Sequence, residues 1–121
     1  MILVDSSVWV DHLRAADATL AGLLDAGRVL GHPFVVGEIA LGRLRHRERV
    51  LDALRDLPQA TVATDQEFHY FVGQHGLSGV GIGYVDAHLL AAARLTAGTS
   101  LWTRDKRLDS VATRLLLAWP Q

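Results

Sequence analysis

Four carboxylates in this chain lie beside apolar segments that a fold would bury. Asp5 and Asp105 each follow an apolar run that predicts a buried strand, whereas Glu38 and Asp86 fall on the apolar sides of predicted helices. Ligands of open parallel sheets bind outside the carboxyl ends of the strands, so we expect the four side chains to share one acidic pocket. Each acid alone also fits an ordinary turn or the start of a helix. The combination is what points to chemistry.

Such a pocket needs a cation. Two like charges about 4 Å apart repel each other by about 4 kcal/mol at an effective dielectric constant of 20. A divalent ion reverses the sign, and carboxylate oxygens suit Mg²⁺ or Mn²⁺, which commonly share their shell with phosphates. These ions activate water and neutralise the charge that builds on a phosphodiester as it is cleaved. Ser7 and Thr103 are candidates to orient the carboxylates by hydrogen bonds, although each hydroxyl also fits a simple helix cap.

The elements that would position these acids alternate along the chain. Ile2, Leu3 and Val4 are consecutive apolar residues, which is typical of a strand covered on both faces in a parallel sheet. The patterns predict strands at 2–4, 29–31, 60–63 and 100–103. They predict helices at 8–14 capped by Ser6 and Ser7, from Asp17 to Gly27, from Pro33 through Leu41, along the basic stretch 43–49 to Leu57, from Thr64 to His75, at 84–97 and at 108–113. Residues 77–83, with three alternating glycines, predict a flexible connection rather than a phosphate loop.

The bulk composition limits the class of protein. The chain has 121 residues, half of them hydrophobic, and no cysteine, so we expect a single domain over residues 1–121 whose metal ligands are Asp, Glu or His. No apolar run approaches the ~18 residues of a membrane helix and no secretory signal is present, which predicts a soluble cytoplasmic protein. The net charge of −1 does not by itself indicate a nucleic-acid-binding protein. The placement of charges must decide that question.

Four motifs together resemble PIN-domain ribonucleases, and among them the VapC-type toxins of toxin–antitoxin pairs. The motifs are Val-Asp-Ser-Ser-Val-Trp-Val-Asp-His-Leu-Arg at 4–14, Gly-Glu-Ile-Ala-Leu-Gly at 37–42, Gly-Ile-Gly-Tyr-Val-Asp-Ala-His-Leu-Leu-Ala at 81–91 and Leu-Trp-Thr-Arg-Asp-Lys-Arg-Leu at 101–108. The resemblance implies a three-layer α/β/α sandwich on a mainly parallel sheet, with Asp5, Glu38, Asp86 and Asp105 on the family's four acidic positions. It also implies Mg²⁺- or Mn²⁺-dependent RNA cleavage, a homodimer, and inhibition by a VapB-type antitoxin. The toxin would contact DNA only indirectly, through this antitoxin.

Basic residues near the acids are candidates for binding RNA backbone. Arg43 and Arg47 follow Glu38, and Arg104 and Lys106 flank Asp105. A solvated helix face explains the arginines of the stretch 43–49 equally well. Asp109 is a further candidate to line the groove, whereas His88 should point away from Asp86 on the same helix.

Two other functions fit the sequence less well. A receiver-type phospho-acceptor domain wants paired acids after its first strand, but Ser6 and Ser7 follow Asp5 here. A catalytically inactive PIN-like binding module is the second alternative, and the complete acidic quartet argues against it.

Overall fold

The sheet at the centre of the molecule has the first strand of the chain in its middle. The computed structural model describes residues 1–120. Its parallel strands lie in the order β2-β1-β3, with β1 spanning Ile2–Val4, β2 Val29–Leu30 and β3 Ser100–Trp102. Single parallel bridges, Gly31 with Gln59 and Leu101 with Ala118, continue the pairing at the two edges.

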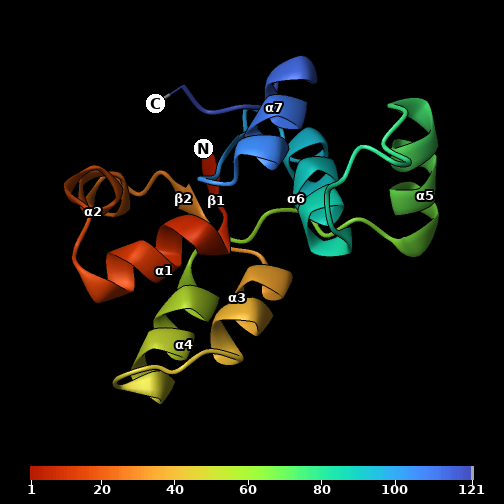
Figure 1. Ribbon diagram of the computed structural model, residues 1–121. Helices are drawn as coiled ribbons and strands as arrows, with labels where there is room; N and C mark the ends of the chain where they lie inside the picture. Colours follow the sequence, from red (N-terminus) through yellow and green to blue (C-terminus); the bar gives the residue numbers. More distant parts are fainter. Residues whose placement is uncertain (121) are drawn as a thin grey trace.

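Helices cover both sides of this sheet. Those described are α1 (Ser6–Arg14), α2 (Ala18–Asp25), α3 (Pro33–Ala40), α4 (Arg47–Asp56), α5 (Asp65–Gln74), α6 (Tyr84–Leu95) and α7 (Lys106–Arg114). In Figure 1 the sheet lies between α2 on one side and α6, with α5 outside it, on the other. The predicted α/β/α sandwich with a parallel sheet is therefore confirmed. No helix within residues 1–120 has the length and hydropathy to cross a bilayer.

The core is built from β1 and α6. The three side chains of β1 are at most 1% exposed, because neighbouring strands flank it and helices cover it. On α6, seven consecutive residues, 87–93, are buried, which encloses every face of a helix with 3.6 residues per turn. Small alanines at four of these positions let α5 and the sheet approach closely. The two segments that precede or carry Asp5 and Asp86 are thus the most firmly held in the fold.

Several predicted helix ends are confirmed. The side chain of Asp17 accepts a hydrogen bond from Leu20 N at 2.9 Å and caps α2. Thr64 and Glu67 form the expected capping box at the start of α5. Gly27 follows α2 with φ +68°, as its role in ending that helix requires.

Other local predictions were wrong. Helix α1 begins at Ser6 with Asp5 as its N-cap, so the serine hydroxyls do not cap it. Residues 43–46 are not helical, because His46 takes the left-handed conformation (φ 55°) immediately before α4. Residues 60–63 form no strand, since the sheet contact there ends with the single bridge at Gln59. Leu41, expected in the core, is 90% exposed, and α7 begins at Lys106, two residues earlier than predicted.

Candidate acidic site

Asp5 is the most buried of the four acids and the most tightly held. It is 4% exposed at the end of β1, where its backbone N–H still donates to Trp102 O of β3 at 2.9 Å. Its Oδ2 accepts hydrogen bonds from Ser7 Oγ at 2.7 Å and Thr103 Oγ1 at 2.8 Å. Two donors on one oxygen fix the carboxylate's orientation. They also satisfy a charge that burial would otherwise penalise.

Glu38 reaches the same place from α3. Ser6 Oγ donates to Glu38 Oε1 at 2.9 Å and lies 3.5 Å from Asp5 Oδ1, so one hydroxyl links the two acids. Burial raises the pKa of Glu38, Ser6 opposes the shift, and the charges of Asp5 and Asp86 add to it. The expectation that Glu38 lies inside an apolar stripe was wrong, because the residue is exposed at the edge of α3.

Asp86 and Asp105 each stand at the start of a helix. Asp105 caps α7 by accepting from Leu108 N at 2.9 Å, and it follows β3 as Asp5 follows β1. Asp86 Oδ2 accepts from Gly83 N at 3.1 Å in the first turn of α6. Burial raises the pKa of Asp86, the hydrogen bond from Gly83 opposes the shift, and the charges of Asp5 and Asp105 add to it.

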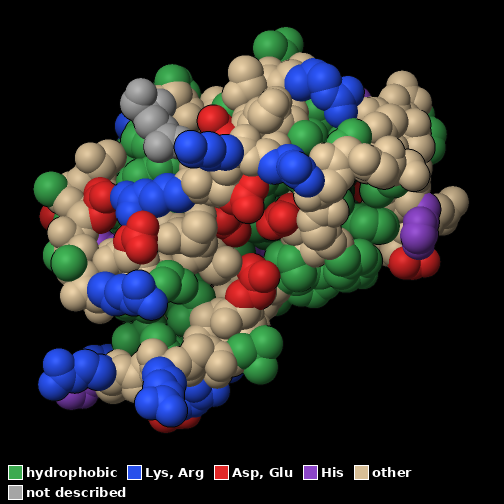
Figure 2. All heavy atoms as spheres, in the orientation of Figure 1, with side chains coloured by type: hydrophobic (Ala, Val, Ile, Leu, Met, Phe, Trp, Pro, Cys, Tyr) green, Lys and Arg blue, Asp and Glu red, His purple; other side chains and the backbone are tan. Residues whose placement is uncertain are grey.

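The four acids therefore lie within electrostatic reach of one another. Asp5 and Asp86 act on Glu38, and Asp5 and Asp105 act on Asp86, so the repulsion connects the whole set. Figure 2 shows acidic side chains gathered in a hollow of the face where α1, α3, α6 and α7 come together in Figure 1. A fold gains no stability from this arrangement unless a cation occupies it.

The donor set suits a hard, hydrated cation. All four side chains offer carboxylate oxygens. The hydroxyl groups of Ser6, Ser7 and Thr103 donate hydrogen bonds to two of these carboxylates, those of Asp5 and Glu38. Within residues 1–120, no three Asp, Glu or His side chains lie close enough together to hold a metal ion between them. Mg²⁺ keeps several water molecules and is commonly bound through only one or two carboxylates, so an open set of this kind fits it.

The basic residues divide into two groups. Arg104 bonds to Asp11 and, at 2.6 Å, to Asp17, so its guanidinium ties the end of β3 to α1 and the start of α2. The hydrogen bond to Asp11 is the main cause of the raised Arg104 pKa. Arg43, Arg47 and Lys106 are exposed, and within residues 1–120 no ion pair is formed by them.

Two features of the site were missed by the sequence reasoning. Ser6 was interpreted as a helix cap, although its position directly after Asp5 could have suggested a second contact to the acids. Gly81, in the loop between α5 and α6, has φ +85° and lies under the side chain of Arg107. An added Cβ would come within 2.9 Å of Arg107 Cδ. The positive φ favours glycine here, whereas the contact with Arg107 involves a flexible, exposed side chain that can shift.

His88 points away from the acids, into an aromatic cluster. Its ring is 3% exposed and stacks on Phe68 with centroids 4.2 Å apart, and the rings of Phe34 and Tyr84 meet it edge-on. Burial lowers its pKa, so the imidazole is neutral. Asp109 lies half-buried in the first turn of α7.

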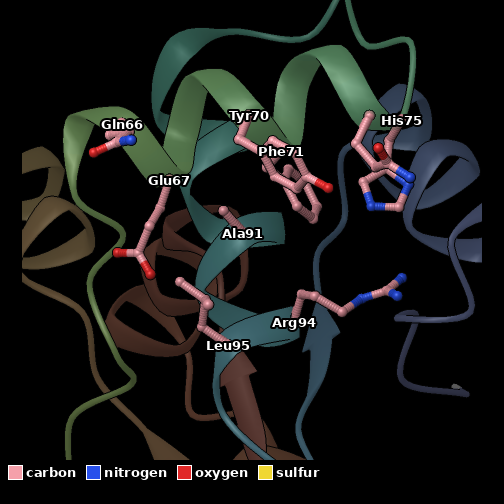
Figure 3. A pocket seen from close by; sticks show the side chains of 9 residues that line it. Gln66, Glu67, Tyr70, Phe71, His75, Ala91, Arg94 and Leu95 are labelled. Atoms are coloured by element: carbon pink, nitrogen blue, oxygen red, sulfur yellow. The ribbon is translucent and has the colours of Figure 1, made fainter.

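A pocket of about 390 Å³ lies away from the acidic quartet, between α5 and the C-terminal half of α6 (Figure 3). Tyr70, Phe71 and Leu95 give it an apolar lining. Its only carboxylate is that of Glu67, which already accepts from Thr64 N in the capping box.

Comparison with known proteins agrees with this geometry. Residues 2–114 match the family model of the PIN domain. The chain is also 52% identical over 110 residues to Ribonuclease VapC32 of Mycobacterium tuberculosis, both in strain CDC 1551 / Oshkosh and in strain ATCC 25618 / H37Rv. Each alignment covers 91% of this chain and 89% of the relative.

Proposed function

Because the chain belongs to the PIN-domain family, we propose that it is a metal-dependent endoribonuclease, the toxin of a toxin–antitoxin pair. The predicted resemblance to this family is confirmed by the match over residues 2–114 and by the 52% identity to a ribonuclease. The observation that carries the catalytic assignment is the convergence of the acids: Ser6 Oγ contacts both Asp5 and Glu38, and acidic side chains gather in one hollow of the surface in Figure 2.

The carboxylates have distinct parts in this proposal. Asp5, Glu38, Asp86 and Asp105 would hold Mg²⁺ or Mn²⁺, which when bound would supply a water of lowered pKa and positive charge for the phosphodiester. Asp5, fixed by Ser7 and Thr103, presents a ligand oxygen in constant orientation, and Asp86 and Asp105 present theirs from two helix starts. The Glu38 carboxylate is accessible to solvent and partial burial raises its pKa, which suits it to orient the attacking water and accept its proton.

Protein partners follow from the same assignment. We propose a VapB-type antitoxin as the inhibitor, a homodimer as the active form, and DNA contact only through the antitoxin. Leu41, 90% exposed just beyond Glu38, supports a protein that covers this side of the pocket. Co-purification of the chain with its antitoxin, and light scattering of each species, test these assignments.

The decisive experiment is RNA cleavage by the purified protein and by an Asp5→Asn variant. Total cellular RNA is incubated with Mg²⁺, with Mn²⁺ and with a chelator. We expect cleavage by the wild type with either metal, none with chelator, and a loss of at least about a hundredfold in Asp5→Asn, because a buried ligand is removed. Asp56→Asn, which changes an exposed acid of α4, is the matched control and should cleave normally.

Each unexpected result has a definite meaning. Equal cleavage by wild type and Asp5→Asn would contradict the four-carboxylate mechanism. RNA binding without cleavage by a folded wild-type protein would favour the inactive PIN-like binding module instead.

A further inference from the structure

An aromatic pair, exposed Tyr84 and half-buried Phe34, lies on the two helices that carry Asp86 and Glu38. Tyr84, the first residue of α6, is 59% exposed. Its ring lies 6.3 Å from that of half-buried Phe34 in α3, with only 27° between the ring planes. The two rings therefore present stacked aromatic surface that continues into solvent.

This pair and the acids span the same two helices. Glu38 follows Phe34 by four residues, which is about one turn and 6 Å along α3. Asp86 follows Tyr84 by two residues in the first turn of α6, and its charge acts on Glu38. Figure 2 shows hydrophobic side chains exposed immediately beside the acidic group. Phe34 and Glu38 thus lie about one helical turn apart on α3.

The exposed ring is held rigidly from behind. Tyr84 packs against Phe68 at 5.0 Å and His88 at 4.7 Å, and these two stack on each other at 4.2 Å. His88 is 3% exposed, and neither of its ring nitrogens has a hydrogen-bond partner among the described residues. The His88 ring thus packs against Tyr84 and holds it in place. Little side-chain entropy of Tyr84 would then be lost when a ligand stacks on its ring.

The charge balance leaves room for a contact of this kind. Proteins that bind single-stranded nucleic acid combine backbone neutralisation with aromatic stacking, and each stacked base contributes about 1–3 kcal/mol. Arg104, which directly precedes Asp105, already pairs with Asp11 and Asp17, whereas Lys106, which directly follows it, is exposed. The chain as a whole carries a net charge of −1. Stacking would therefore add to the limited neutralisation of the backbone that the unpaired cations supply.

We propose that Tyr84, backed by Phe34, stacks against a nucleobase of the RNA nucleotide that flanks the scissile phosphate. This inference rests on the proposed ribonuclease function and names a residue that positions its substrate. Stacking tolerates every base, because every base has a π face, so Tyr84 sets register on the strand rather than sequence preference.

The test compares Tyr84→Leu, Tyr84→Phe and a matched control, Tyr70→Leu. Tyr70 is 71% exposed on α5, and it lines the separate pocket of Figure 3. Single-turnover cleavage of a labelled single-stranded RNA is measured against enzyme concentration. For Tyr84→Leu we expect the half-saturating concentration to rise about tenfold. Tyr84→Phe, which keeps the ring, and Tyr70→Leu should match the wild type.

A second substrate separates stacking from a structural effect. It carries an abasic nucleotide on either side of the mapped cleavage position. On one of these substrates wild type and Tyr84→Leu should become equal, because no base remains to stack. A Tyr84→Leu defect of the same size on every substrate would overturn the proposal, as would a half-saturating concentration unchanged from wild type. Loss of antitoxin binding with unchanged RNA kinetics would also overturn it, by assigning the ring to a protein contact.

Failure of the ribonuclease function itself is recognisable from the wild type alone. If the wild type shows no metal-dependent cleavage, the nuclease assignment fails, and the ring is judged by equilibrium binding of the same oligonucleotide. Equal affinity of wild type and Tyr84→Leu in that measurement would overturn the stacking proposal.

Discussion

The orientation of the Asp5 carboxylate depends on hydrogen bonds that the hydroxyl groups of Ser7 and Thr103 donate to it. Replacing Thr103 by Val keeps the side-chain shape and removes the 2.8 Å donor to Asp5 Oδ2. We expect activity to fall about tenfold, as for outer hydrogen bonds at other metal sites, and unfolding free energy to fall by about 1–3 kcal/mol. Cleavage rates and denaturant titration check this. Thr113→Val, which removes an exposed hydroxyl bond to Asp109 O, is the control and should leave the cleavage rate unchanged.

His32 predicts how stability depends on pH. Burial, with a smaller effect of His88, lowers its pKa from 6.5 to about 4, and its Nδ1 accepts from Phe34 N at 3.0 Å to cap α3. In the unfolded chain His32 therefore binds a proton as the pH falls below 6.5, whereas in the folded protein it stays neutral until about pH 4. Stability contributed by neutral His32 is complete above pH 6.5 and declines as pH falls toward 4, by up to about 3 kcal/mol.

Thermal melts between pH 7 and pH 4.5 measure this effect. His32→Asn keeps a residue that can cap the helix but removes the titration, so its melting temperature should fall less over this range. Parallel curves for the two proteins would assign the acid sensitivity to other groups, of which buried His88 is the first to examine.

At the scale of elements, the loop before α6 is fitted to α7. Gly81→Ala forces both an unfavourable φ of +85° and a clash with Arg107, whereas Gly79→Ala meets only an unfavourable φ of +75° with nothing within 4 Å. We expect Gly79→Ala to cost about 1 kcal/mol and Gly81→Ala measurably more. Chemical denaturation compares them. Adding Arg107→Ala should reduce the excess cost of Gly81→Ala, and an unchanged excess would show that Arg107 is not its cause.

The segment that joins α3 to α4 tests the basic contribution to RNA binding. Arg43 and Arg47 are exposed and form no ion pair within residues 1–120. If they meet the phosphate backbone, Arg43→Ala with Arg47→Ala should weaken RNA binding and lower the slope of log affinity against log salt by about 1.4 for single strands. Fluorescence anisotropy across a salt series measures the slope. Arg55→Ala, on the same helix and paired with Asp52, is the control, and an unchanged slope in the double variant would assign both arginines to solubility.

For the whole molecule, the acidic pocket opposes folding when no cation is bound. Asp86→Asn removes one charge from the coupled set and keeps an oxygen for Gly83 N. We expect the metal-free variant to melt a few degrees above the metal-free wild type, for a gain of about 1 kcal/mol. Added Mg²⁺ should stabilise the wild type more than the variant. Calorimetry with and without chelator checks both, and a variant that melts lower with the same response to Mg²⁺ would contradict this account.

The sequence predicted the first strand and several helix starts well because those signals are local. The apolar run before Asp5 and the capping box at Thr64 each depend on a few neighbouring residues, and the structure has both. The prediction failed where distant packing decides. Residues 43–46 have helical composition, but His46 turns the chain there, and residues 60–63 have strand composition without a full partner strand. The role of Tyr84 depends on α3 and α5, which no spacing within α6 reveals.

The central position of β1 has a consequence for synthesis of the protein. Thr103, which orients Asp5, lies 98 residues later in the chain, and β3, which completes the sheet beside β1, directly precedes Thr103. A nascent chain that has emerged only through α6 carries Asp5, Glu38 and Asp86 but lacks β3, Thr103 and Asp105. The quartet therefore cannot be assembled until translation has passed Asp105, and until then the ribosome works beside an incomplete nuclease.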